Sequence, residues 1–394
     1  MPSVPPLPVQ RSRGMRDLLP ADMRAFRRVE DAFRAAATRW GYEEVRTPTI
    51  ETYRLFTAAG ALTPEMLSRV YSFLDWDGWS GERVVLRPDS TIPVARAAAE
   101  GNLGLPARLF YVQNVFRFSE TDDREDWQCG IEYLGAPDAI GDLEVAAVAA
   151  ETLDALGLKA QVRLSHVSIT RAVSESVQAS ARNGVATHGL GALRGNVTNP
   201  QVAAFLEVAL QPAGDPALLD NLAALAHSSV PAALPAIEEL AGVAKALAAS
   251  GRTVLIDLGM PRDFDYYTGV VFEFESHGES WGGGGRYSPG GPGTASTACG
   301  LGLEAGLLAS HMAPTTRERM VVAVTPASPS DMGRAISVAR ALHRGGISAA
   351  LSGEPGASKL GVTVSGSSLV ARTPDGERAM SALDDVVGLL IQYK

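Results

Sequence analysis

Residues 260–287 read MPRDFDYYTGVVFEFESHGESWGGGGRY, the stretch that combines the most charged, aromatic and glycine residues in the chain. The apolar residues 270–274 predict a strand, and the four glycines at 282–285 predict a turn after it. Glycine lets a ligand approach the backbone closely, while tyrosine offers a flat apolar wall with a polar tip. The stretch therefore predicts a pocket for a small amphiphilic ligand. A hairpin with a flexible glycine-rich loop and two core tyrosines is the alternative.

Length and composition exclude several classes of protein. The 394 residues predict one large and one small domain with an insertion. No apolar run reaches the roughly 18 residues that a membrane span needs. The first ten residues, MPSVPPLPVQ, lack the apolar block of a signal peptide, so we expect a cytoplasmic protein without a membrane partner. A net charge of −9 and a pI near 5.3 provide no basic surface, so no nucleic-acid partner is expected.

The cysteines and histidines do not form a pattern of metal ligands. Cys129 and Cys299 lie far apart among apolar or glycine residues, which predicts reduced, buried thiols. The glycines at 282–285 lack the Lys and Ser or Thr that complete a P-loop. We therefore expect no metal and no cofactor. The scattered histidines without ligand spacing are His166, His188, His277 and His311.

The apolar residues near the start of the chain predict a helix followed by a strand. A stripe from Met23 to Trp40 recurs every three or four residues and predicts a helix that ends at Gly41. Residues 43–51 predict a strand that Pro48 interrupts. Because proline cannot donate to a strand ladder, this strand suits an edge or an interface.

A long antiparallel hairpin is predicted over residues 108–135. Because side chains alternate along a strand, Gln128, Gly130 and Glu132 share one face of the return strand, and the glycine leaves a gap between the amide and the carboxylate. A carboxylate among apolar neighbours needs a partner, and we expect Arg117 on the outgoing strand to provide it. The alternative is a solvated strand face.

The chain after the hairpin predicts further helices and strands. A helix is predicted over residues 142–156, with Asp142 as its N-cap. The alanine- and leucine-rich residues of about 169–250 predict a small helical insertion, and residues 299–312 predict a helix that carries Glu304. Additional strands are predicted over residues 83–87, 161–166 and 253–257.

A polar linker near residues 314–317 predicts a domain boundary. Residues 1–316 would form the large domain, which contains the candidate pocket. Residues 317–394 alternate apolar strand-like runs with helical segments, which predicts a small α/β domain.

Six motifs follow one another along the chain: GMRDLLP, TPTIE, LRPDST, FRF with QCGIE, RDFDYYTG and GGRY. In this order they resemble the catalytic fold of class II aminoacyl-tRNA synthetases, and most closely the histidyl branch. The resemblance covers about residues 14–309. It implies an α+β fold with an antiparallel sheet flanked by helices, a small helical insertion and a small C-terminal α/β domain.

The resemblance also implies a site for free histidine. Asp89, Gln128 and Glu132 would contact the ammonium and the imidazole, and two arginines would lie toward the carboxylate. Such acidic, amide and cationic groups complement the polar parts of a free amino acid. The histidine-binding residues that the resemblance implies are Asp89, Thr91, Arg117, Gln128, Glu132, Arg262, Tyr266, Tyr267 and Tyr287.

Three positions depart from the synthetase pattern. Ala305 stands where the third class motif has an arginine for the γ-phosphate of ATP. The loop between Arg117 and Gln128 is short and acidic, and Asp89 replaces a glutamate. Loss of one clamp on developing phosphate charge costs about 100-fold or more in rate. These departures argue against adenylate formation.

The departures resemble the non-catalytic members of the family, the regulatory subunits that partner a short catalytic ATP phosphoribosyltransferase in the first step of histidine biosynthesis. The resemblance implies a homodimer within a hetero-oligomer, L-histidine as effector, and feedback inhibition of the partner, with no catalytic residue in this chain. Arg117 and Arg262 are both present, as in an active enzyme. A histidyl-tRNA synthetase is therefore the alternative, and a free-standing histidine sensor is a third hypothesis.

Overall fold

The computed structural model describes residues 11–58, 64–76, 81–120, 123–177, 189–193, 197–260, 266–289, 297–313, 320–354 and 358–393. The chain divides into two compact units, Met1–Pro314 and Thr315–Lys394. Within the described ranges, no helix is both long and apolar enough to cross a membrane.

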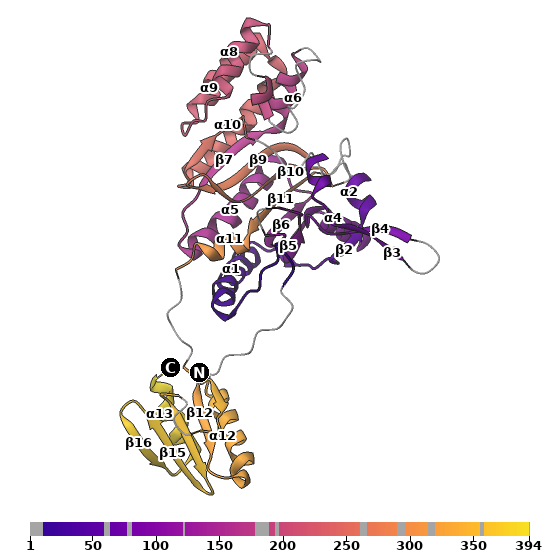
Figure 1. Ribbon diagram of the computed structural model, residues 1–394. Coiled ribbons are helices and arrows are strands. Elements are labelled where there is room, and N and C mark those ends of the chain that lie inside the picture. Colours follow the sequence, from indigo (N-terminus) through magenta and orange to yellow (C-terminus); the bar gives the residue numbers. More distant parts are fainter. Residues whose placement is uncertain are drawn as a thin grey trace. The chain divides into compact units, whose positions relative to one another are not determined.

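An eight-stranded sheet forms the centre of the first unit (Figure 1), with strand order β1-β5-β6-β11-β10-β9-β7-β8. The central pairs are antiparallel, whereas β1 with β5 and β7 with β8 at the two edges are parallel. The predicted fold class is confirmed, with a mixed sheet in place of a purely antiparallel one. The strands are β1 Glu43–Glu44, β5 Ala107–Phe116, β6 Glu125–Leu134, β7 Gln161–His166, β8 Val254–Ile256, β9 Tyr267–Ser276, β10 Glu279–Tyr287 and β11 Ala298–Glu304.

Three helices, α1 (Pro20–Arg39), α5 (Asp138–Leu156) and α11 (Ala305–Ser310), pack against this sheet around a shared apolar core. The predicted apolar stripe of α1 is confirmed, since Phe26 and Phe33 are buried. Helix α5 begins four residues before its predicted start, so Asp142 lies inside the helix instead of capping it. At this position inside the helix, Asp142 is fully buried where α5 packs against the sheet.

A second, three-stranded sheet has the order β2-β4-β3. The segment predicted as one strand around Pro48 is divided between the two sheets, because β1 pairs with β5 whereas β2 pairs with β4. Proline at the break removes the hydrogen-bond donor that a continuous strand would need. The elements here are β2 Ile50–Thr52, α2 Tyr53–Ala58, α3 Pro64–Ser68, β3 Ser72–Trp76, β4 Gly81–Leu86 and α4 Thr91–Glu100.

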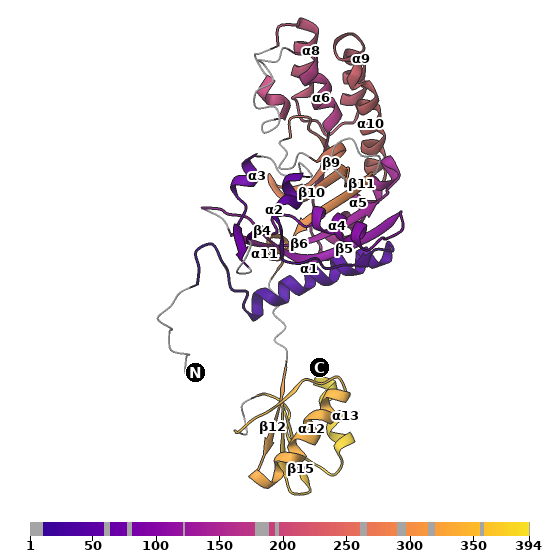
Figure 2. The ribbon, with the colours of Figure 1, turned by 90° about the vertical axis from the view of Figure 1, so that its right-hand side faces the viewer.

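The predicted helical insertion lies between β7 and β8, and its helices gather at the end of the unit away from α1 (Figure 1, Figure 2). Its first helix follows β7 directly, and its last helix leads back to β8. The helices are α6 Val167–Glu175, η2 Gly189–Leu193, α8 Pro200–Ala209, α9 Ala217–Ser229, η3 Pro231–Ala233 and α10 Leu234–Ala249.

The four glycines at 282–285 lie within strand β10, so the predicted turn at this position is wrong. The chain reverses earlier, at His277 and Gly278, both of which have positive φ. Glycine is needed at these positions because the neighbouring strands leave no room for a side chain. A Cβ on Gly284 would lie 2.0 Å from the carbonyl oxygen of Gly300, and one on Gly282 would lie 2.2 Å from that of Gly302.

The predicted helix over residues 299–312 is also wrong in its first half. Residues up to Glu304 continue strand β11, and helix α11 begins only at Ala305. Strand β11 pairs with both β6 and β10, and this two-sided pairing outweighs the local sequence signal. Glu304 is consequently the last residue of a central strand.

The second unit holds a five-stranded mixed sheet with the order β13-β12-β14-β15-β16. Strand β12 pairs in parallel with β13 and β14, and the remaining pairs are antiparallel. Strands β15 and β16 were not among the predicted elements. The elements are β12 Val322–Pro326, η4 Pro329–Asp331, α12 Met332–Arg344, β13 Ala349–Leu351, β14 Gly361–Ser365, β15 Ser368–Thr373, β16 Gly376–Met380, α13 Leu383–Leu390 and η5 Ile391–Tyr393.

Candidate ligand-binding site

A cavity of about 230 Å³ lies against strands β6, β9, β10 and β11, and glycines of β10 and β11 contribute to its lining. This volume is below the roughly 300 to 1,000 Å³ of pockets for drug-sized ligands, so it suits a molecule of amino-acid size. Glu132 does not line the cavity but accepts a hydrogen bond from the lining residue Tyr287, whereas Arg262 and His188 lie outside the described residues. The predicted site residues that line the cavity are Asp89, Thr91, Arg117, Gln128, Tyr266, Tyr267 and Tyr287.

Glu132 is a fully buried carboxylate at the base of the site. The hydroxyl of Tyr287 donates to its Oε2 over 2.7 Å, and Oε1 has no hydrogen-bond partner among the described groups. Burial raises the pKa of Glu132 to about 8, and the hydrogen bond from Tyr287 is the strongest cause that opposes this rise. This pKa favours a protonated Glu132 at neutral pH.

Arg117 is not the partner of Glu132 that the sequence predicted. The β5–β6 register pairs Glu132 with Leu109, eight residues before Arg117. At about 3.4 Å per residue, that separation is about 27 Å, too far for a side chain to bridge. Arg117 instead donates from Nε to the carbonyl oxygen of Pro88, over 2.8 Å, and its charge partly offsets the burial that raises the pKa of the neighbouring Asp89.

The gap predicted above Gly130 is filled by Tyr111, which the sequence analysis missed. Tyr111 and Gly130 pair across β5 and β6, and a Cβ on the glycine would lie 2.2 Å from the tyrosine Cζ. Tyr111 lines the cavity, and burial raises the pKa of its hydroxyl well above the ordinary value. The hairpin register is the signal that would have placed it, because it sets the aromatic ring opposite the glycine.

Asp89 lies where helix α4 begins. Its Oδ1 accepts hydrogen bonds from the backbone N–H groups of Thr91, at 3.0 Å, and Ile92, at 3.4 Å. Burial raises the pKa of Asp89, while Arg117 and these N–H groups act in the opposite direction. One carboxylate oxygen thus holds the helix start in place, where the helix dipole favours negative charge.

The other end of the cavity is rich in hydrogen-bond acceptors. Gln128 Nε2 donates to Glu304 Oε1 over 3.1 Å. Burial raises the pKa of the nearby Asp126 carboxyl to about 7, and the negative charge of Glu304 is the second cause of this rise. Glu304 lines the cavity but was not predicted as a site residue, because its stretch was assigned to a helix.

Three buried oxygens at the site have no hydrogen-bond partner among the described groups: Gln128 Oε1 and Glu304 Oε2, and also Glu132 Oε1, which is an acceptor once that carboxyl is ionised. A buried acceptor without a donor costs about 1 to 3 kcal/mol. A ligand that brings N–H groups would remove this cost. The arrangement therefore favours a donor-rich, cationic ligand over a polyanionic one.

The two cysteines lie in this region but serve packing. Cys129 and Cys299 are buried and unpaired, and burial raises the pKa of both thiols above the ordinary value. In the described part of the chain, no group of three or more His, Cys, Asp or Glu side chains could hold a metal ion.

Comparison with known proteins agrees with this geometry. Residues 14–306 match the family model for histidyl-tRNA synthetase. The chain belongs to the histidyl-tRNA synthetase family. A family member from Dehalococcoides mccartyi named ATP phosphoribosyltransferase regulatory subunit is 41% identical over 294 residues, which cover 71% of each chain.

Other histidyl-tRNA synthetase family members resemble the chain over a greater length. A histidine–tRNA ligase of Methanosarcina acetivorans is 30% identical over 344 residues, covering 81% of this chain and 80% of the ligase. A crystal structure from Bacillus halodurans, described as an ATP phosphoribosyltransferase regulatory subunit/histidyl-tRNA synthetase, superposes with a TM-score of 0.73 at 26% identity. It covers 88% of this chain and 93% of that one, which confirms the predicted family and fold.

Proposed function

We propose that this chain is a regulatory subunit of ATP phosphoribosyltransferase that binds free L-histidine. It is a homodimer that assembles with short catalytic subunits, is required for their activity and makes them sensitive to histidine. Residues 1–316 form the histidine-binding domain, and residues 317–394 form a second, small α/β domain. The chemical reaction belongs to the partner.

The observation that carries the proposal is the excess of unpaired acceptors at the cavity. The ammonium and the imidazole N–H of histidine are donors, and each charge-assisted hydrogen bond contributes roughly 1.5 to 3 kcal/mol. Three or four such bonds place the affinity in the micromolar range after the entropy of binding is subtracted. The tyrosines of the lining, Tyr266, Tyr267 and Tyr287, supply apolar surface for the ring.

Two features argue against adenylate formation. Ala305 is fully buried at the first position of α11, so no cation projects from this position toward a triphosphate. Arg124, the cation of the acidic loop, stacks over the ring of Phe118 at 4.4 Å and donates to the carbonyl oxygen of Ser119. Its charge is thereby held within the loop. The relative at 41% identity, named a regulatory subunit, supports the same assignment.

A histidyl-tRNA synthetase is the alternative, favoured by the presence of Arg117 and by the match to a histidine–tRNA ligase. Two assays separate the proposals. Isothermal titration should show micromolar histidine binding that Glu132→Ala abolishes. Pyrophosphate exchange with histidine and ATP should stay at background, also in Ala305→Arg, because the acidic loop is a second, independent deficit. Exchange by the unmodified chain well above background would establish the synthetase instead.

A further inference from the structure

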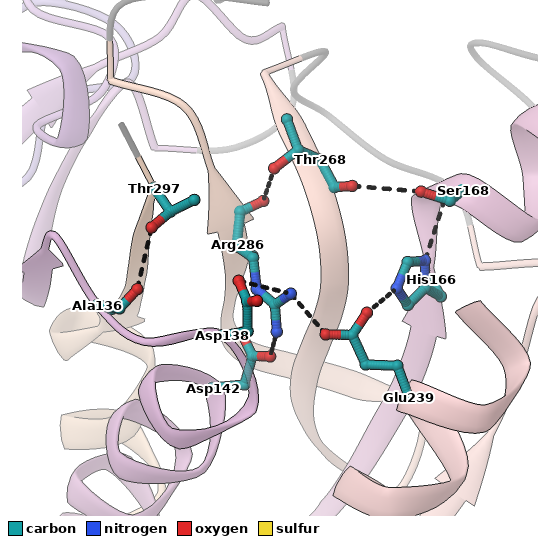
Figure 3. Close-up of polar contacts among 9 residues, drawn as sticks. All are labelled: Ala136, Asp138, Asp142, His166, Ser168, Glu239, Thr268, Arg286 and Thr297. Atoms are coloured by element: carbon teal, nitrogen blue, oxygen red, sulfur yellow. Dashed lines mark hydrogen bonds and ion pairs between the residues drawn. The ribbon is translucent and has the colours of Figure 1, made fainter. Parts of the chain in front are cut away.

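A second buried polar network, formed by residues that do not line the cavity, is centred on Arg286 (Figure 3). Arg286 and Tyr287 are neighbours on β10, and successive side chains of a strand point to opposite faces. Tyr287 reaches Glu132 on the cavity side, whereas Arg286 enters a group of carboxylates on helices α5 and α10. Two adjacent residues of β10 therefore make polar contacts on the two opposite faces of the sheet.

Two helices hold the guanidinium of Arg286. Its Nη1 donates to Glu239 Oε1 of α10 over 2.5 Å, and its Nη2 donates to Asp142 Oδ2 of α5. Asp138 adds an ion pair at 3.5 Å. Arg286 is 8% exposed and Asp142 is fully buried, so solvent screens this contact little. Because both terminal nitrogens of the planar guanidinium are bound, the strand that carries Arg286 can move little.

Glu239 links this contact to both ends of the helical insertion. His166 Nδ1 accepts from the backbone N–H of Ser168 over 3.1 Å and so caps helix α6. The ring proton must then sit on Nε2, which donates to Glu239 Oε2 over 3.1 Å. One carboxylate oxygen thus binds Arg286 and the other binds His166, so the first and last insertion helices are both tied to β10.

The electrostatics agree with an ionised Glu239. The hydrogen bond from His166 is the largest cause that lowers the pKa of Glu239 to about 2, and Arg286 acts in the same direction. Neutral His166 suffices for this bond, because its Nδ1 already accepts a backbone hydrogen. Removal of Arg286 itself would be costly, since it would leave the charge of the fully buried Asp142 uncompensated.

We propose that Arg286 is a positioning residue for the ligand site, held by the insertion through Glu239 so that Tyr287 stays against Glu132. The proposal rests on the histidine-binding function proposed above. It gives the insertion a part in ligand affinity, although none of the described residues between 167 and 249 lines the cavity. The physical reason is that rotation of β10 would move Arg286 and Tyr287 together, because they share a backbone.

Glu239→Gln is the decisive variant. It keeps the shape of the side chain and lies partly exposed at the surface, so the protein should fold. Isothermal titration of the full-length chain should show histidine affinity reduced by about 2- to 30-fold, the usual range for residues that act through another group. Glu144→Gln is the matched control: it lies on α5 and pairs with Arg108 away from β10. Its affinity should stay within twofold of the unmodified chain.

A double-mutant cycle separates positioning from a general loss of structure. If Arg286 acts through Tyr287, Glu239→Gln should reduce affinity much less in a Tyr287→Phe background than in the unmodified chain. Additive effects, or unchanged affinity in Glu239→Gln while the unmodified chain binds histidine, would overturn the proposal and leave the proposed function intact. Absence of any histidine binding by the unmodified chain would instead overturn the proposed function, and this inference with it.

Discussion

Tyr287 donates its hydroxyl hydrogen to Oε2 of Glu132 over 2.7 Å, and neither side chain is exposed to solvent. Strand β11 lies between β6, which carries Glu132, and β10, which carries Tyr287. Gly300 of β11 pairs directly with Glu132. A Cβ on Gly300 would lie 2.0 Å from that same Oε2. The buried contact therefore exists because the intervening strand has no side chain at this position.

Tyr287→Phe should destabilise the protein and weaken histidine binding. Glu132 would lose its closest donor while staying buried, at a cost of about 1 to 3 kcal/mol in the free energy of unfolding. Urea unfolding and isothermal titration measure the two effects. Tyr42→Phe is the control, because Tyr42 donates to Glu144 over 3.0 Å outside the cavity. It should lower stability modestly and leave affinity unchanged; equal losses of affinity in both variants would contradict this role of Tyr287.

Gly300→Ala should displace Glu132 and abolish histidine binding. The added methyl group would overlap the carboxylate, and overpacking of this kind costs about 1 to 3 kcal/mol. Gly302→Ala is the matched control on the same strand, since the nearest atom to its Cβ would be 3.6 Å away. We expect a normal melting temperature for Gly302→Ala and a lowered one for Gly300→Ala. Equal stability of the two variants would show that the glycine at 300 is not required.

Histidine binding should release a proton from Glu132 at neutral pH. The pKa of this carboxyl is raised to about 8 in the folded chain, whereas it is about 4.3 in an unfolded chain. Between these values the folded state keeps a proton that the unfolded state has lost, so the free energy of unfolding falls as pH rises through the window. A ligand cation favours the ionised carboxylate, so affinity should increase toward pH 8.

The proton release is measured by titration at pH 7 in buffers with different ionisation enthalpies. Glu132→Gln, studied at higher protein concentration, should release fewer protons than the unmodified chain. Protons from histidine itself are common to both proteins and cancel in the comparison. Identical release by the two would mean that the carboxyl of Glu132 does not titrate on binding.

The sequence predicted those features of the site that depend on local periodicity. Alternation along β6 predicted that Gln128 and Glu132 share one face; Gln128 lines the cavity, and Glu132 accepts a hydrogen bond from the lining residue Tyr287. The helical stripe of α1 was likewise visible, because an apolar repeat of three or four residues marks a buried helix face. The helical insertion was predicted from its alanine- and leucine-rich composition. The order of short motifs then indicated the family.

Features that depend on neighbouring strands could not be predicted in this way. Consecutive glycines usually indicate a turn, yet Gly284 lies in a central strand. The residue there is glycine because the carbonyl oxygen of Gly300 leaves no room for a side chain. Asp142 looked like a helix cap but forms an ion pair with Arg286, 144 residues away. Such contacts follow from the packing of the whole sheet and have no local signal.

The central claim is that a catalytic partner needs this chain and that histidine acts through it. The most direct test is phosphoribosyl-ATP formation from ATP and phosphoribosyl pyrophosphate by a short catalytic ATP phosphoribosyltransferase subunit, with and without this chain and with added histidine. We predict no activity from this chain alone, activity in the mixture, and several-fold to about hundredfold inhibition by histidine, the usual range of allosteric coupling. Glu132→Ala should preserve the activity of the mixture and blunt the inhibition. A mixture of folded proteins that neither assembles nor gains activity would contradict the account.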